Sequence, residues 1–356
     1  SPVVAAVHQR VRALSKDLIL ASEAEKLSKH MAKRFDKGIA LNINVLGEAV
    51  LGDHEANLRF QSILEMMRRP EVNYISVKLS SIVAQLIIID IDGSIDRVSE
   101  KMRILYREAQ QHGVFVNLDM EEYRDLDLTA QAFMRTLSRP GLEQVRAGIA
   151  LQAYIPDSFL MQQRITEWSK QRVARGGSPV TIRIVKGANM EMERIDAALH
   201  DWPQAPYRSK LETDANYKQM LHYGLHPENL AAVRIGIASH NLFDVAYGLV
   251  LAAEVKAEDN VQFEMLEGMA NHQRRALLEK TASLLLYAPA CLKEEFLNAI
   301  GYLIRRLDEN TGPENFLGHA FRLQPGSGDW QMLEQGFRHA FSPPISNEPQ
   351  RQQNRL

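Results

Sequence analysis

Eight short runs rich in branched apolar residues, each separated from the next by helical segments, constrain the fold of this chain more than any other feature. The intervening segments, for example IDRVSEKMRILYREAQQHG, carry apolar residues at three- and four-residue spacing and end in glycine, which is typical of helices. Near-continuous apolar strands that are joined by helices indicate a parallel sheet. The runs are residues 39–47, 74–80, 114–120, 148–154, 180–187, 233–239, 261–266 and 283–289.

Eight strand-helix units predict a (βα)8 barrel, and an open doubly wound sheet is the runner-up. We expect three parts: an N-terminal helical arm at 1–35, the barrel at 36–342 and a polar tail at 343–356. The longest gap between strands follows the KGAN segment, at the carboxyl end of the fifth run, where barrel enzymes build their sites.

Composition narrows the class of protein. The chain has 356 residues and a formal net charge of −2 without a long basic run, so nucleic acid is not expected as a partner. Cys291 is the only cysteine, which excludes an internal disulfide framework and fits a reducing, cytoplasmic setting. No apolar run approaches the roughly 18 residues of a membrane span, and the first residues lack the layout of a signal peptide.

Polar and charged residues gather at the ends of the predicted strands, where the side chains of a barrel face its site. They are Lys78, Asp119, Gln152, Arg183, Lys186, His240, Asn241, Glu264 and Tyr287. A charged residue inside a strand costs several kcal/mol if it is buried without a partner, so each one is either a paired core ion or part of a site. The set as a whole favours a site, and its cations favour an anionic ligand.

Adjacent arginines, Arg305 and Arg306, follow an apolar helical segment and precede a Gly-Pro stop. Two forked donors that face one pocket can bracket a carboxylate, although a solvated basic patch is the plainer interpretation. His222 and His226 have the spacing of metal ligands, but Pro227 follows and a third ligand is not evident, so we expect no metal. Cys291 is expected to be a packing residue.

Three functions remain open from the residues alone. The lysines at strand ends allow a Schiff-base aldolase, because a desolvated lysine is a workable nucleophile. The cationic character allows an enzyme that binds a carboxylate substrate together with a phosphate-bearing cofactor. A noncatalytic barrel that binds a small anion is the third.

The order of short blocks along the chain resembles the proline dehydrogenase domain of the proline utilization A flavoenzymes. The blocks are LGEA, YISVKLSSI, NLDMEEY, LQAY, RIVKGAN, TDANY, ASHN, FEMLEGM, LLYAP and YLIRRLDEN. The resemblance implies a distorted (βα)8 barrel that binds FAD noncovalently and oxidises L-proline to Δ1-pyrroline-5-carboxylate. It also implies transfer of electrons to a membrane quinone, a peripheral contact with the cytoplasmic membrane, and a pyrroline-5-carboxylate dehydrogenase domain in the same polypeptide or as a separate partner.

Site residues follow from the same resemblance, position by position. The substrate residues that it implies are Lys78, Asp119, Leu266, Tyr287, Tyr302, Arg305 and Arg306. The FAD residues that it implies are Asp119, Met120, Gln152, Arg183, Val185, Lys186, Gly187, Lys210, Thr213, His240, Asn241, Glu309 and Phe316. One departure is local: Asn189 and Met190 stand where the family commonly has an aromatic pair. Another is larger: the chain has no Rossmann fingerprint for the aldehyde dehydrogenase domain of bifunctional members.

Overall fold

A closed parallel barrel forms the centre of the computed structural model. The structure describes residues 15, 17–46, 52–84, 86–87, 90–281, 283–296, 299–304, 315–342 and 345–349. Strands β2 to β9 pair in chain order, and β9 also pairs with both β8 and β2, which closes the ring. The strands are β1 (Leu20–Ala21), β2 (Ile39–Val45), β3 (Tyr74–Val77), β4 (Phe115–Leu118), β5 (Ala147–Gln152), β6 (Val180–Val185), β7 (Val233–Ala238), β8 (Val261–Leu266) and β9 (Leu284–Cys291).

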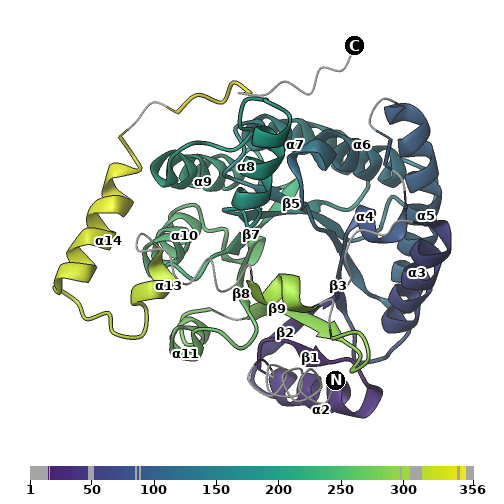
Figure 1. The fold of residues 1–356 in the computed structure, drawn as a ribbon, viewed down its shortest axis with the longest axis horizontal. Helices are drawn as coiled ribbons and strands as arrows, with labels where there is room; N and C mark the ends of the chain where they lie inside the picture. Colours follow the sequence, from purple (N-terminus) through teal and green to yellow (C-terminus); the bar gives the residue numbers. More distant parts are fainter. Residues whose placement is uncertain are drawn as a thin grey trace.

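Helices surround this ring (Figure 1). They are α2 (Ala24–Phe35), α3 (Asp53–Met67), α4 (Leu79–Ile82), α5 (Ile91–His112), α6 (Leu126–Leu137), α7 (Asp157–Ala174), α8 (Met190–Leu199), α9 (Lys210–Gly224), α10 (Leu242–Glu254), α11 (Asn271–Leu278), α13 (Phe316–His319) and α14 (Gly328–His339), with short 3-10 helices η1 (Tyr123–Asp125) and η2 (Glu258–Asn260). All eight predicted strands are confirmed, and so is the predicted barrel. The helix expected before the third strand ends as predicted, because Gly113 adopts a left-handed conformation at the cap of α5 (φ 69°).

The chain departs from the predicted elements at two points. The run at 74–80 leaves the strand after Val77 and turns into α4, where the Ser81 hydroxyl donates to the Lys78 carbonyl at 2.7 Å. The predicted arm also contains a strand, β1, which pairs in parallel with the end of β9 outside the ring. The segment before the barrel is therefore partly built into the sheet.

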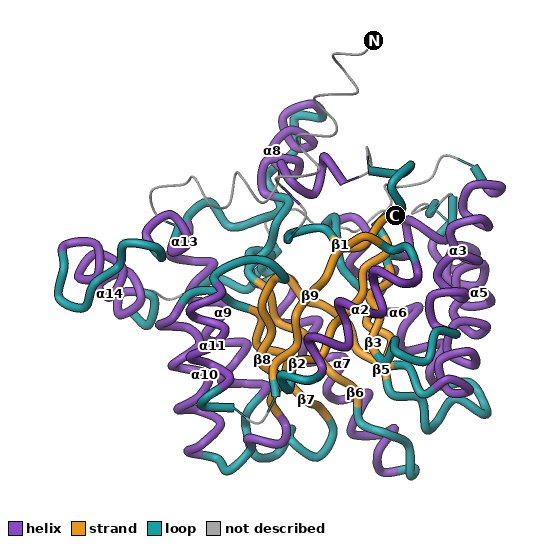
Figure 2. Tube along the Cα trace, turned by 90° about the horizontal axis from the view of Figure 1, so that it is seen from below, coloured by secondary structure: helices purple, strands orange, loops and turns teal. Residues whose placement is uncertain are grey.

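The main apolar core lies between the ring of strands and the helices around it. Buried apolar side chains from both form one continuous cluster. Helix α8 follows β6 and lies beyond the carboxyl ends of the strands (Figure 2). This is the insertion that the long gap after KGAN predicts. Cys291 is buried at the end of β9, as expected of a packing residue. Across the described residues, we find no helix that is both long and apolar enough to cross a membrane.

Candidate active site

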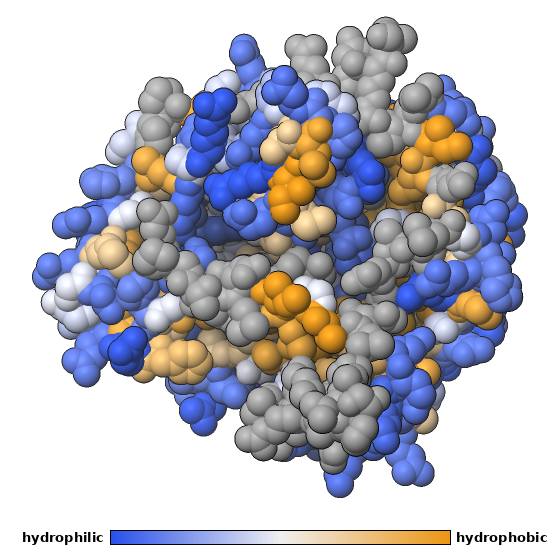
Figure 3. All heavy atoms as spheres, in the orientation of Figure 1, coloured by the Kyte–Doolittle hydropathy of each residue, from blue (hydrophilic) through white to orange (hydrophobic). Residues whose placement is uncertain are grey.

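A cavity of about 320 Å³ opens at the carboxyl ends of the strands. It lies at the end of the barrel that Figure 3 faces, where mostly hydrophilic residues surround smaller apolar patches. Its lining includes nearly every described residue that the sequence nominated for a site: Lys78, Asp119, Met120, Gln152, Arg183, Val185, Lys186, Gly187, Lys210, His240, Asn241, Glu264, Leu266, Tyr287, Tyr302 and Phe316. The barrel thus brings together residues from seven strands and the segments that follow them.

Three nominated residues lie outside the described part of the chain, namely Arg305, Arg306 and Glu309. Thr213 is described but is not among the lining residues, and its hydroxyl is 3.4 Å from the Ser209 carbonyl in the first turn of α9. The cavity also includes residues that the sequence did not nominate. Asn44, Glu121 and Ser239 are examples, and each is a polar residue at or just beyond the end of a strand.

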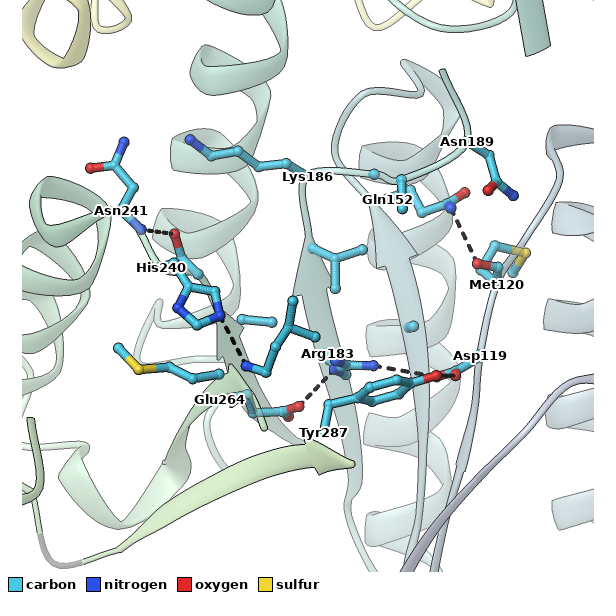
Figure 4. Close-up of a pocket in the computed structure, with 18 of the residues that line it drawn as sticks. Asp119, Met120, Gln152, Arg183, Lys186, Asn189, His240, Asn241, Glu264 and Tyr287 are labelled. Carbon is cyan, nitrogen blue, oxygen red and sulfur yellow. Dashed lines mark hydrogen bonds and ion pairs between the residues drawn. The ribbon is translucent and has the colours of Figure 1, made fainter. Parts of the chain in front are cut away.

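Arg183 lies at the base of the cavity between two carboxylates, and we call Asp119, Arg183 and Glu264 the guanidinium cluster (Figure 4). Its Nε is 2.6 Å from Glu264 Oε2, and an Nη is 3.3 Å from Asp119 Oδ1. Burial by itself would lower the pKa of Arg183, but Glu264 and Asp119 outweigh it and raise that pKa. The guanidinium is therefore a permanent cation at this position.

Glu264 and Asp119 hold that cation in different ways. Glu264 is buried, and burial raises its pKa while Arg183 acts in the opposite direction. Gly236 on the neighbouring strand makes room for it, since a Cβ there would be 2.5 Å from Glu264 Oε1. Asp119 instead accepts hydrogen bonds from Ser76 and Asn117 on Oδ1, at 3.1 and 3.0 Å.

Tyr287 completes the base of the cavity. Its hydroxyl donates to Asp119 Oδ2 at 2.6 Å, and its ring lies 4.7 Å from the Arg183 guanidinium carbon. Burial raises the pKa of Tyr287, and the adjacent Asp119 adds to the effect. Tyr287 is therefore a neutral hydrogen-bond donor, and Asp119 receives donors on both of its oxygens.

A second group of charges, the lysine cluster, consists of Lys186, Lys210, Asp214, Lys218 and Asp244, of which Lys186 and Lys210 line the cavity. Lys186 Nζ is 2.6 Å from both Asp214 Oδ1 and Asp244 Oδ2. Burial alone would lower the pKa of Lys186, but Asp244 and Asp214 reverse the effect and raise it. Burial would raise the pKa of Asp214, but Lys186 and Lys210 lower it to about 2. Sequence reasoning missed both aspartates, because Asp214 lies on α9 and Asp244 lies on α10, and neither is at the end of a strand.

The remaining wall is built from amides and a histidine. Gln152 Nε2 donates to the Met120 carbonyl at 3.1 Å, and Asn189 Nδ2 donates to the Glu121 carbonyl at 2.8 Å. His240 Nε2 accepts from the Leu266 amide at 3.0 Å. Asn189, which replaces an aromatic residue common in the resembled family, therefore fastens the loop after β6 to the loop after β4.

Lys78 forms an ion pair with Glu121, whose other oxygen accepts from the Ser80 hydroxyl at 3.0 Å. A ligand carboxylate at Lys78 would have to share this ammonium with Glu121. Lys78 is therefore already paired with Glu121.

A larger cavity, of about 800 Å³, lies at the opposite ends of the strands. Its lining includes Arg146, Arg234 and Lys280, which are exposed, and a stacked pair of Tyr74 and Phe115 rings 4.5 Å apart. The buried ion pairs of Arg183 and Lys186 lie at the smaller cavity. We therefore take the smaller cavity as the candidate active site, although the other cavity has the greater volume. Within the described residues, no group of three or more His, Cys, Asp or Glu side chains could hold a metal ion.

Fold and cavity together define a class: a (βα)8 barrel with a charged ligand cavity at the carboxyl ends of its strands, the arrangement of barrel enzymes. The family within that class is shown by sequence, because the family model described as proline dehydrogenase matches residues 27–319. The chain belongs to the proline dehydrogenase family.

Similar proteins agree with this assignment. The proline dehydrogenase of Deinococcus radiodurans is 25% identical over 71% of this chain and 73% of its own length. The bifunctional protein PutA of Klebsiella aerogenes is 24% identical over 87% of this chain, but this chain spans only 24% of that protein. The structure of proline utilization A from Corynebacterium freiburgense superposes with a TM-score of 0.86 and 41% identity over 96% of this chain and 34% of that one.

A second solved relative is proline utilization A from Bdellovibrio bacteriovorus inactivated by N-propargylglycine. It has 27% identity and a TM-score of 0.86, and the match covers 97% of this chain and 37% of that one. The chain thus spans about a third of these solved relatives, and 73% of the Deinococcus radiodurans proline dehydrogenase.

Proposed function

We propose that this chain oxidises L-proline to Δ1-pyrroline-5-carboxylate with FAD as its cofactor, and that the electrons pass on to a quinone. The observation that carries the proposal is the guanidinium cluster at the base of a cavity in a proline dehydrogenase barrel: Arg183 is held by two carboxylates and lies against the ring of Tyr287. A fixed positive charge of this kind stabilises negative charge that develops on a ligand beside it.

The donors around the cavity suit FAD. Lys186 and Lys210 provide positive charge for a diphosphate, and the lysine cluster has more cations than carboxylates. Gln152, Asn189, His240 and Asn241 provide the uncharged polar groups that a heterocyclic ring system requires. When bound, FAD accepts the hydride that leaves C5 of proline.

The chain's own residues would bind and orient the substrate. Lys78 and, by the family resemblance, Arg305 and Arg306 hold the proline carboxylate. Tyr287, Tyr302 and Leu266 line the cavity and would enclose the ring carbons. Positioning is the main catalytic device in such a site.

Asp119 is better suited to organise the site than to remove a proton. Four groups, Ser76, Asn117, Arg183 and Tyr287, share its two oxygens. A carboxylate with this many partners is held in one orientation, so we assign Asp119 the role of orienting Arg183 and the substrate amine.

The aldolase alternative loses support at Lys186. A Schiff-base lysine requires a depressed pKa, whereas the two aspartates raise the pKa of Lys186. Lys218 does have a pKa lowered to about 8, but it is buried beneath Phe337 and does not line the cavity.

Anaerobic addition of L-proline to the purified protein tests the proposal. We expect a yellow protein whose flavin absorbance bleaches and that releases FAD, not FMN, on denaturation. A folded protein that remains colourless after incubation with FAD, or a flavin that proline fails to bleach, would overturn it.

Further parts of the proposal are a quinone acceptor, a peripheral membrane contact and a pyrroline-5-carboxylate dehydrogenase partner. Each can be tested by adding a soluble quinone, lipid vesicles or that dehydrogenase to the reduced protein.

A further inference from the structure

Glu267 is a buried carboxylate that immediately follows Leu266, one of the cavity walls. Its side chain is 0% exposed. Its amide donates to the Tyr287 carbonyl at 2.9 Å, so the backbone at this point connects the wall residues of β8 and β9. A shift of the Glu267 backbone would therefore be passed on to Leu266 and Tyr287.

Two arginines and a histidine converge on this carboxylate, and two of the three side chains come from α2. Arg34 donates to both oxygens, with its Nε 3.0 Å from Oε2. His30 Nε2 is 3.6 Å from Oε2, and Arg274 Nη1 is 3.9 Å from Oε1. Burial would raise the pKa of Glu267, but His30 and Arg34 outweigh it and lower that pKa, so the group is ionised and paired.

The segment before the barrel also packs on the outer side of the same walls. Ile19 belongs to a buried apolar cluster with Tyr287 and Tyr302, and Leu18 and Leu266 pack against that cluster. Gly268 has a positive φ of 79°, and a Cβ there would lie 1.9 Å from the Asp17 carbonyl oxygen. Only glycine allows this close approach between the N-terminal segment and the loop after β8.

We propose that residues 17–35 act through Glu267 as a positioning element, which sets where Leu266 and Tyr287 stand and hence how tightly the pocket closes on a five-membered ring. The proposal rests on the proposed function for the identity of the substrate. Arg34 and Glu267 are positioning residues, because their contacts run to the wall residues and neither lines the cavity.

Arg34→Met and Glu267→Gln each break the ion pair between Arg34 and Glu267. Arg34→Lys keeps the positive charge but cannot donate to both carboxylate oxygens as the guanidinium does. Displacing a wall by about 1 Å can cost as much as about 100-fold, so we expect the KM for L-proline to rise at least about tenfold in Arg34→Met. The value of kcat and the FAD content should change little. Arg34→Lys should recover part of the loss, and Arg34→Met with Glu267→Gln should lose no more than the worse single variant, because the two act as a unit.

Arg172→Met is the matched control. Arg172 is also buried, but it donates to the carbonyls of Leu142 and Ser178, at 2.8 and 2.9 Å, near the opposite ends of the strands. Arg172→Met should lower the melting temperature and leave the KM for L-proline unchanged.

Binding of cyclopentanecarboxylate, measured by calorimetry, reports on the pocket without turnover. It should weaken in Arg34→Met and Glu267→Gln but not in Arg172→Met.

The two failures are distinguishable. If proline did not reduce the wild-type flavin, the proposed function would fall, and cyclopentanecarboxylate binding would still show whether the wall had moved. If Arg34→Met and Glu267→Gln lowered only the melting temperature, as Arg172→Met does, Glu267 would be a stabilising ion pair and the positioning role would be wrong. Should Arg34→Met not fold, Arg34→Lys and Glu267→Gln carry the same comparison.

Discussion

The guanidinium cluster and the lysine cluster are built alike, yet their balance of charge is opposite. Each places a cation between two carboxylates: Arg183 between Asp119 and Glu264, and Lys186 between Asp214 and Asp244. Among the residues that the structure describes, no further cation forms an ion pair with the first cluster, so its carboxylates outnumber its cations. The second is joined by Lys210 and Lys218, so cations outnumber carboxylates.

The opposite charge balance indicates that the two clusters have different roles, although both place a cation between two carboxylates. Surplus positive charge can bind an anionic group, such as a phosphate, without disrupting existing pairs. In the guanidinium cluster, the two carboxylates instead hold a single guanidinium in one orientation. We therefore assign binding of the cofactor's phosphates to the lysine cluster and orientation of the reacting groups to the guanidinium cluster.

Arg183→Met should have the largest effect, since it removes the cation of the guanidinium cluster and leaves Asp119 and Glu264 without their shared partner. Loss of one preorganised charge at a reacting centre typically lowers kcat by about 10²- to 10³-fold. Stopped-flow measurement of flavin reduction by proline gives the rate, and Arg172→Met is again the control for loss of a buried arginine. A normal reduction rate in Arg183→Met would remove this residue from the chemistry.

Lys186→Met should weaken the other cluster in a different way. A charged hydrogen bond contributes about 1.5–3 kcal/mol, so the dissociation constant for FAD should rise by about 10- to 150-fold. Titration of the apoprotein with FAD measures this, and the variant saturated with FAD should be reduced by proline at close to the wild-type rate. A variant with normal FAD affinity and slow reduction would exchange the roles of the two clusters.

Much of the fold follows from the sequence because strand periodicity and turn residues are local signals. The run at 39–47 illustrates this, since its branched residues alternate with Asn42 and Asn44, and β2 forms over almost all of it. Strand β1 was missed because two residues carry no periodicity, and only its partner β9 makes it a strand. The early end of β3 was missed because a serine hydroxyl, not a residue pattern, turns the chain into α4.

The site was predictable to the extent that it depends on strand ends. Arg183 and Glu264 were nominated from their positions alone, and they form an ion pair. Partners such as Asp214 and Asp244 lie on helices, where a charged residue is usually solvated, and nothing local shows that Lys186 will reach them. Glu267 was missed for a similar reason, because its partner Arg34 is 233 residues away in the chain.

Lys218 provides a smaller test, on stability instead of activity. Burial lowers its pKa to about 8, and Asp244 offsets only part of that effect. Because the unfolded lysine titrates near 10.5, the unfolded state binds more protons between about pH 8 and 10.5, so stability should rise with pH across this window. Lys218→Met should abolish the rise, as measured by urea unfolding at a series of pH values. The same slope in wild type and variant would mean that Lys218 does not titrate in this range.

Tyr287→Ser tests the cavity wall beside the guanidinium cluster and should change the choice of substrate more than the rate with proline. Tyr287 is 7% exposed, and its hydroxyl is already committed to Asp119, so a hydroxyl group on the substrate ring would meet the aromatic ring without a free partner. Such a wall disfavours the added group by roughly 1–3 kcal/mol, or about 10- to 200-fold in kcat/KM, so trans-4-hydroxyproline should be a poor substrate for the wild type. Serine makes room and leaves a hydroxyl near the same place, so the ratio of kcat/KM for the two amino acids should move toward one. Tyr223→Ser on α9, where the ring packs against Phe159 away from the cavity, is the matched control and should keep the wild-type ratio. Two outcomes would contradict this role: equal use of hydroxyproline and proline by the wild type, or the same ratio in Tyr287→Ser as in Tyr223→Ser. Tyr287 would then support Arg183 without contacting the substrate. The pocket wall would instead be formed by Tyr302 and Leu266.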